Sequence, residues 1–169
     1  NVQPTGEGLN YFQLIMDHYR TFRRLGLNVD FVHKNTEDFS RYKLISVVGA
    51  IHISTDLISR ISKAMATLVF GPRTGARVGN MQIPKNLPPQ INLVKSRILR
   101  VETLPSNVSL EIDPLGRAGR YIEIIKLDNN ASPYLKLKNG QVIATKEESG
   151  VIYLASMIDQ KGLTAFYQK

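Results

Sequence analysis

The stretch from Tyr42 to Gly75 constrains the fold of this chain more than any other. Residues Lys43 to Val48 form a short apolar run with β-branched side chains and no alternation, which predicts an interior strand covered on both faces. Ser54 or Thr55 then offers an N-cap, and the apolar residues that follow recur at helical spacing. Thr67 to Phe70 is a second apolar run. The order strand, helix, strand predicts a right-handed crossover between parallel strands.

Functional loops of such a sheet lie at the carboxyl ends of its strands. Here these loops are Gly49 to Ile53 and Gly71 to Gly75. His52 is the only histidine in them, and a hydrogen-bonded structural role is the alternative to a functional one. We therefore expect any binding surface to lie at this edge of the sheet.

The remaining N-terminal residues predict one helix and one further strand. An apolar stripe from Leu9 predicts a helix that ends at Gly26. We interpret His18 and its tyrosine neighbours on this helix as amphipathic cover with solvated tips. Asn28 to Val32 is a strand candidate. A single turn, in which Phe39 tucks under the sheet, must then serve as the crossover to the strand at Lys43.

The chain changes character after Gly75. A long segment with few secondary-structure signals follows, and Pro88 and Pro89 can open a short helix. Short β-like runs then alternate with turn residues, and Asn139-Gly140 is a strong hairpin signal. The runs are 98–104, 109–112, 121–127, 134–137, 141–145 and 151–155, and a helix over 157–167 closes the chain. We expect one domain over 1–169, with an α/β half followed by an antiparallel extension.

Composition excludes several classes of protein. The chain of 169 residues has no cysteine, which removes disulfides, thiolate zinc sites and cysteine nucleophiles. The net charge is +8, and six basic residues with no acid lie between Pro72 and Arg100, namely Arg73, Arg77, Lys85, Lys95, Arg97 and Arg100. Aromatic side chains are absent there, so a stacking surface for nucleic acid is missing. We expect neither a nucleic-acid nor a membrane partner.

Catalytic and cofactor motifs are missing from the sequence. Glu37-Asp38 and Glu147-Glu148 are adjacent acids in turn segments, where neighbours usually point apart into water rather than bracket a sugar. The three histidines are too dispersed for a metal site, and no phosphate-binding glycine loop follows a strand. We therefore expect no catalytic residue, no metal and no cofactor. The pattern favours a binding or interaction domain.

Two motifs carry a resemblance to a known family. GPRTG at 71–75, followed by QIPKNLPP at 82–89, resembles the β-galactosidase trimerisation domain of family 42 glycoside hydrolases, and the likeness covers nearly the whole chain. The resemblance implies a flavodoxin-like or class I glutamine amidotransferase-like parallel sheet flanked by helices. It also implies an upstream catalytic (β/α)8 barrel and assembly into a homotrimer. The catalytic glutamates of the family belong to the barrel, so none is carried over to this chain.

The start of the chain departs from the family pattern. Family domains have a strand before the helix that we begin at Leu9, and this chain starts after it. The strand has been cut away, or Val2 to Thr5 partly replaces it, or the sheet is rearranged by pairing between chains. On each explanation we expect the isolated chain to be oligomeric or fragile.

The resemblance and the residue patterns meet in the loop after Phe70. An extended arm with apolar anchors between charged groups is typical of subunit interfaces, and Arg73 could be bidentate to a partner carboxylate. A salt bridge within the domain is the alternative. The candidate interface or pocket-wall residues are Arg73, Thr74, Arg77, Met81, Ile83 and His52. Two other functions stay open: a small-molecule or carbohydrate-binding module that uses the strand-end crevice at 49–53, and an enzyme in its own right.

Overall fold

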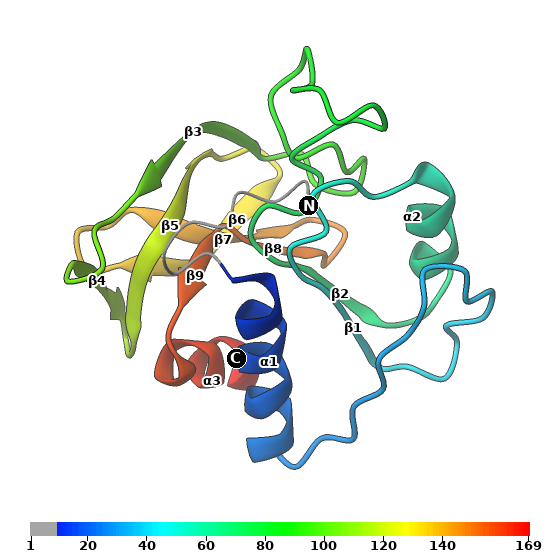
Figure 1. Ribbon diagram of the computed structural model, residues 1–169, viewed down its shortest axis with the longest axis horizontal. Coiled ribbons are helices and arrows are strands. Elements are labelled where there is room, and N and C mark those ends of the chain that lie inside the picture. Colours follow the sequence, from blue (N-terminus) through cyan, green and yellow to red (C-terminus); the bar gives the residue numbers. More distant parts are fainter. Residues whose placement is uncertain (1–9) are drawn as a thin grey trace.

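The computed structural model describes residues 10–169, and this part contains three helices and nine strands (Figure 1). The helices are α1 (Tyr11–Arg24), α2 (Thr55–Ser62) and α3 (Gln160–Gln168). The strands are β1 (Leu44–Val47), β2 (Thr67–Phe70), β3 (Arg97–Thr103), β4 (Ser109–Asp113), β5 (Arg117–Lys126), β6 (Ala131–Leu137), β7 (Val142–Glu147), β8 (Ile152–Leu154) and β9 (Ser156–Ile158). The expected replacement strand Val2 to Thr5 lies outside the described residues.

The strand, helix, strand unit is confirmed. Ser54 caps α2, because its side chain accepts a hydrogen bond from the backbone N–H of Leu57 at 3.2 Å. Strand β1 pairs in parallel with β2, with Leu44 opposite Thr67. The interior position expected for the first strand is wrong: in the sheet formed by residues 10–169, β1 is an edge strand whose four residues are only half-buried.

The expected flavodoxin-like or amidotransferase-like parallel sheet flanked by helices is wrong. The observed sheet is mixed and has the strand order β1-β2-β8-β7-β6-β4-β5-β3, with β9 beside β5. Only the pairs β1–β2 and β2–β8 are parallel in the described part of the chain, and the others are antiparallel. Because β8 lies directly beside β2, the predicted C-terminal extension provides most of one continuous sheet.

The sheet folds back on itself into a sandwich-like body. Strand β4 pairs with both β6 and β5, and β5 then packs across the core against β7. Figure 1 shows β3, β4 and β5 on one side of the molecule and helices α1 and α3 side by side at one end. One hydrophobic cluster lies between the layers and includes Ile122, Ile143 and Phe166. A second lies under α2 and includes Ile61 and Phe70.

Other local predictions had mixed outcomes. Helix α1, the strands at 98–104 and after it, the closing helix and the burial of Phe39 are confirmed, as is the Asn139-Gly140 hairpin, which joins β6 to β7. The strand predicted at Asn28 to Val32 is wrong, because this segment is irregular and Phe31 is 69% exposed. The short helix predicted after Pro88 is wrong too, since only turns are found there.

Candidate functional site

The loop at residues 71–77, here called the arginine loop, closes over the carboxyl ends of β1 and β2. The backbone N–H groups of Gly75 and Arg77 donate to the carbonyls of Ala50 and Ile51, each at 2.9 Å. The strand-end crevice is therefore filled by the chain's own backbone. A small-molecule module at this position has no room for its ligand.

A buried carboxyl group on β5 holds the beginning of the arginine loop. Glu123 is 2% exposed, and its Oε1 accepts hydrogen bonds from the backbone N–H of Arg73 at 3.2 Å and the hydroxyl of Tyr121 at 2.8 Å. Its Oε2 accepts one from the hydroxyl of Tyr153 at 2.7 Å. No lysine or arginine side chain of residues 10–169 forms an ion pair with Glu123.

Burial dominates the electrostatics of this cluster. Removal from water raises the pKa of Glu123 to about 7, although the three hydrogen bonds favour the charged form and oppose the rise. Burial and the neighbouring carboxylate also raise the pKa of the Tyr121 and Tyr153 hydroxyls, so both are protonated donors at neutral pH.

Arg73 is held in an unusual backbone conformation directly above Tyr121. Its φ angle is 67°, in the left-handed region that residues other than glycine rarely occupy. The guanidinium carbon lies 5.6 Å from the centroid of the Tyr121 ring, within the range of a cation–π contact. Arg77 lies near the same ring, since its charge, like that of Arg73, lowers the pKa of Tyr121.

The structure separates the six residues selected from the sequence. It brings Arg73 and Arg77 together at Tyr121. Thr74 is fully buried and donates to the carbonyl of Val47 at 3.1 Å, so it braces the loop from inside. The other three lie further along: His52 is exposed beside Gly79, Met81 is half-buried with a φ of 64°, and Ile83 is 72% exposed. A role for these residues at an interface stays a prediction.

A second buried carboxyl group holds the far end of the same segment. Glu147 on β7 is 4% exposed and accepts hydrogen bonds from the backbone N–H groups of Lys95 at 3.0 Å and Ser96 at 3.5 Å. The prediction that Glu147 points into water is wrong, because β7 turns it toward this segment, whereas Glu148 is exposed as expected. Residues 72–96 are thus fastened to the sheet at both ends by glutamates.

Sequence reasoning missed Tyr121, Glu123 and Tyr153. A signal was present, because Glu123 interrupts the apolar run from Tyr121 to Ile125, and an acid in such a run is buried with its strand. What the sequence did not show is that β5 and β8 carry their polar groups to the same loop.

A further buried polar cluster joins α1, α3 and β1. His18 is 3% exposed, so the solvated tip expected for it is wrong. Its Nδ1 lies 2.8 Å from the hydroxyl of Tyr167, which also lies 3.0 Å from Oγ of Ser46. Burial lowers the pKa of His18 to about 4, so the ring is neutral at pH 7. No residue of the part described hydrogen-bonds to its Nε2.

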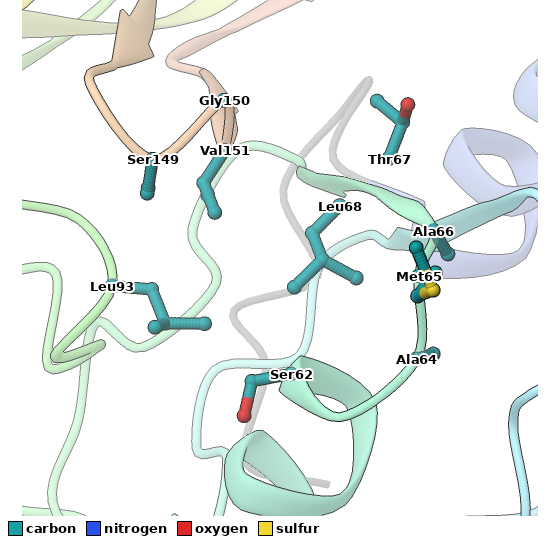
Figure 2. Close-up of a pocket in the computed structure, with 10 residues that line it drawn as sticks. All are labelled: Ser62, Ala64, Met65, Ala66, Thr67, Leu68, Leu93, Ser149, Gly150 and Val151. Carbon is teal, nitrogen blue, oxygen red and sulfur yellow. The ribbon is translucent and has the colours of Figure 1, made fainter.

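Two open grooves lie away from the arginine loop. Figure 2 shows the first, of about 410 Å³, at the amino ends of β2 and β8. It is lined by small, apolar or hydroxyl-bearing residues, among them Met65, Leu68, Leu93 and Val151, and no ionisable side chain. The second, of about 520 Å³, is formed by residues between Asp30 and Tyr42. Neither contains any of the six selected residues.

Metal and membrane features were also sought in the described residues. Within 10–169 there is no group of three or more histidine, aspartate or glutamate side chains placed to hold a metal ion. None of the helices described there combines the length and apolar character needed to span a bilayer.

Comparisons with known proteins agree on one family. The family model described as "Beta-galactosidase trimerisation domain" matches residues 1–169. Beta-galactosidase BgaA of Thermus sp. is 31% identical over 159 residues, a match that covers 92% of this chain and 24% of that protein. Among solved structures, the β-galactosidase of the psychrophilic Marinomonas ef1 gives a TM-score of 0.87 at 29% identity, covering 98% of this chain and 25% of that one.

A more distant structure supports the fold. The polyextremophilic β-galactosidase of the Antarctic haloarchaeon Halorubrum lacusprofundi gives a TM-score of 0.85 at 23% identity, over 98% of this chain and 27% of that one. The chain therefore spans about a quarter of the length of the relatives that it matches.

Proposed function

Because the chain belongs to the β-galactosidase trimerisation domain family, we propose that it is a non-catalytic assembly domain that holds the subunits of a larger β-galactosidase together. In this proposal a separate upstream (β/α)8 domain hydrolyses terminal β-galactosides, and three copies of the whole protein form a homotrimer. The coverage of about a quarter of each relative supports this division, since most of the relatives' length lies outside the matching region.

The observation that carries the proposal is the state of the two arginines in the arginine loop. Neither the Arg73 nor the Arg77 guanidinium has a hydrogen bond or ion pair with another side chain or backbone group of residues 10–169, although both are half-buried at Tyr121. A planar guanidinium is suited to bidentate contact with a carboxylate. A carboxylate from another chain or from the catalytic domain would complete this site.

Apolar side chains beside the two arginines supply the second component of an interface. Ile83 is 72% exposed and Leu87 is 45% exposed, and both belong to the segment fastened by the two buried glutamates. Apolar anchors within a charged rim are the usual composition of a protein interface. We place Met81 and His52 at its margin and give Thr74 the internal role of bracing the loop.

The test is an arginine substitution in the full-length protein. Arg73→Ala should weaken assembly by about tenfold or more, because loss of a hydrogen-bonded charge at an interface typically costs about 2 kcal/mol. Sedimentation velocity over a concentration series measures this as a shift from trimer to smaller species. Arg120→Ala is the matched control, since Arg120 is also a half-buried arginine with a positive φ, 61°. Equal assembly of both variants and the wild type would remove the arginine loop from the interface.

A second experiment tests the non-catalytic part of the proposal. The 169-residue chain alone should not hydrolyse a chromogenic β-galactoside. Turnover that copurifies with the chain and is lost in a variant of one of its own acids would contradict the assignment.

A further inference from the structure

Glu123 is buried without a cationic partner, and this arrangement calls for a physical explanation. A carboxyl group enclosed in an apolar core costs free energy even when it is hydrogen-bonded. Its three donors come from three separate places in the chain: Tyr121 on β5, Tyr153 on β8 and the backbone of Arg73 in the arginine loop. The carboxyl group therefore connects two strands of the sheet to one loop residue.

That loop residue is the one with a strained backbone. A left-handed φ at a residue with a side chain persists only where its surroundings over-determine it. Oε1 of Glu123 receives both the Arg73 N–H and the Tyr121 hydroxyl, so a single oxygen atom fixes the backbone under the guanidinium and the ring beneath it. The guanidinium has no hydrogen bond of its own to the described residues, so these contacts determine its direction.

We propose that Glu123 is a positioning residue for Arg73: its carboxyl group holds the left-handed backbone of Arg73 and the ring of Tyr121 in one arrangement, which directs the guanidinium outward, ready for a carboxylate of the partner. The last step rests on the proposed function. The fixing of the loop does not, and it can be measured separately.

The protonation state of Glu123 is compatible with this role. The groups that face the carboxyl group are the Tyr121 and Tyr153 hydroxyls and the Arg73 backbone, with the Arg73 and Arg77 side chains beyond Tyr121. A proton on Oε2 turns that atom from acceptor to donor toward Tyr153 and leaves both bonds to Oε1 in place. Glutamine reproduces this neutral form, so Glu123→Gln should preserve the loop, whereas Glu123→Ala removes the acceptor.

Hydrogen–deuterium exchange of the full-length protein tests the loop directly. In Glu123→Ala, peptides covering 71–77 should exchange about tenfold faster or more, because the Arg73 amide loses its acceptor. Peptides covering 92–98 should be unchanged. Glu147→Ala is the matched control, since it removes the acceptor of Lys95 and Ser96 and should give the reverse pattern. Glu123→Gln should exchange like the wild type in both segments.

Assembly then tests whether Glu123 acts through Arg73. Glu123→Ala should weaken trimer formation by about the same factor as Arg73→Ala, and the double variant should be no weaker than Arg73→Ala alone, as expected for coupled residues. Glu123→Gln should restore assembly at every pH between 6 and 8.

The outcomes separate the two proposals. Unchanged exchange at 71–77 in Glu123→Ala, or faster exchange in Glu123→Gln that matches Glu123→Ala, would overturn the positioning role. Additive effects of Arg73→Ala and Glu123→Ala on assembly would overturn it as well. If Arg73→Ala assembles normally, the proposed interface fails, and the exchange pattern alone then decides whether Glu123 positions the loop.

Discussion

Glu123 and His18 are both enclosed ionisable side chains with a tyrosine hydroxyl as neighbour, but their hydrogen-bond partners differ. Glu123 accepts three hydrogen bonds from β5, β8 and the arginine loop. His18 contacts only Tyr167 through Nδ1, and its Nε2 has no partner among residues 10–169. The carboxyl group is retained in a costly place because it connects segments, whereas the imidazole is accommodated by remaining neutral.

The two residues make the stability of the fold depend on pH in opposite directions. The pKa of Glu123 is raised from 4.5 to about 7, so its contribution is fully present below pH 4.5 and is lost as pH rises through 7. The pKa of His18 is lowered from 6.5 to about 4, so its contribution is present above pH 6.5 and is lost as pH falls toward 4. Their effects oppose each other between these limits.

Neutralising Glu123 should give the largest effect and break this balance. In Glu123→Gln the unfavourable ionisation at high pH is removed, so the free energy of unfolding at pH 8 should exceed that of the wild type by about 3 kcal/mol. At pH 5 the two proteins should agree within about 1 kcal/mol. Urea unfolding at pH 5, 6, 7 and 8 measures the difference. A constant offset at all four values would show that Glu123 does not titrate in this range.

Replacing His18 should expose the opposite slope, with a smaller effect over the accessible range. The wild type should lose about 2 kcal/mol through His18 between pH 8 and pH 5, because the unfolded ring takes up a proton that the folded ring excludes. His18→Gln keeps a hydrogen-bonding side chain but cannot titrate, so this loss should vanish. The check is the same urea series, with His33→Gln as control, since His33 is exposed. A slope that persists in His18→Gln would place the titration elsewhere.

Removing one hydroxyl from each cluster sharpens the comparison and should have the smallest effect. Tyr153→Phe takes a donor from a group that carries charge, and should cost about 2 kcal/mol at pH 8. Tyr167→Phe takes a partner from two neutral groups, and should cost about 1 kcal/mol. Thermal unfolding at pH 8 measures both. Equal costs would mean that the two clusters do not differ in the way described.

Local signals explain which parts of the fold were predictable. Ser54 at the start of α2, the apolar run of β2 and the Asn139-Gly140 hairpin each act within a few residues, and each was located correctly. Asn28 to Val32 carried the same kind of signal but found no neighbouring strand in the described sheet, so it stayed irregular. A β-like pattern needs a partner before it becomes a strand.

The arrangement of the sheet was not predictable from local signals, and neither was the glutamate beneath the arginine loop. Both depend on β8 lying beside β2, where Val69 faces Ile152 and Phe70 faces Tyr153. That pairing brings Tyr153 to Glu123. The motif 71–75 drew attention to Arg73 and Thr74, while the groups that hold the motif came from strands far away in sequence.

The position of β8 beside β2 also affects how the chain acquires its shape during synthesis. Strand β2 gains its second neighbour only when residues 152–154 have left the ribosome, long after β1, α2 and β2 have been made. Contacts so distant in sequence slow folding, because a long intervening chain must be closed first. The N-terminal third of this domain therefore waits, with one side of β2 uncovered, for the end of the domain to be translated.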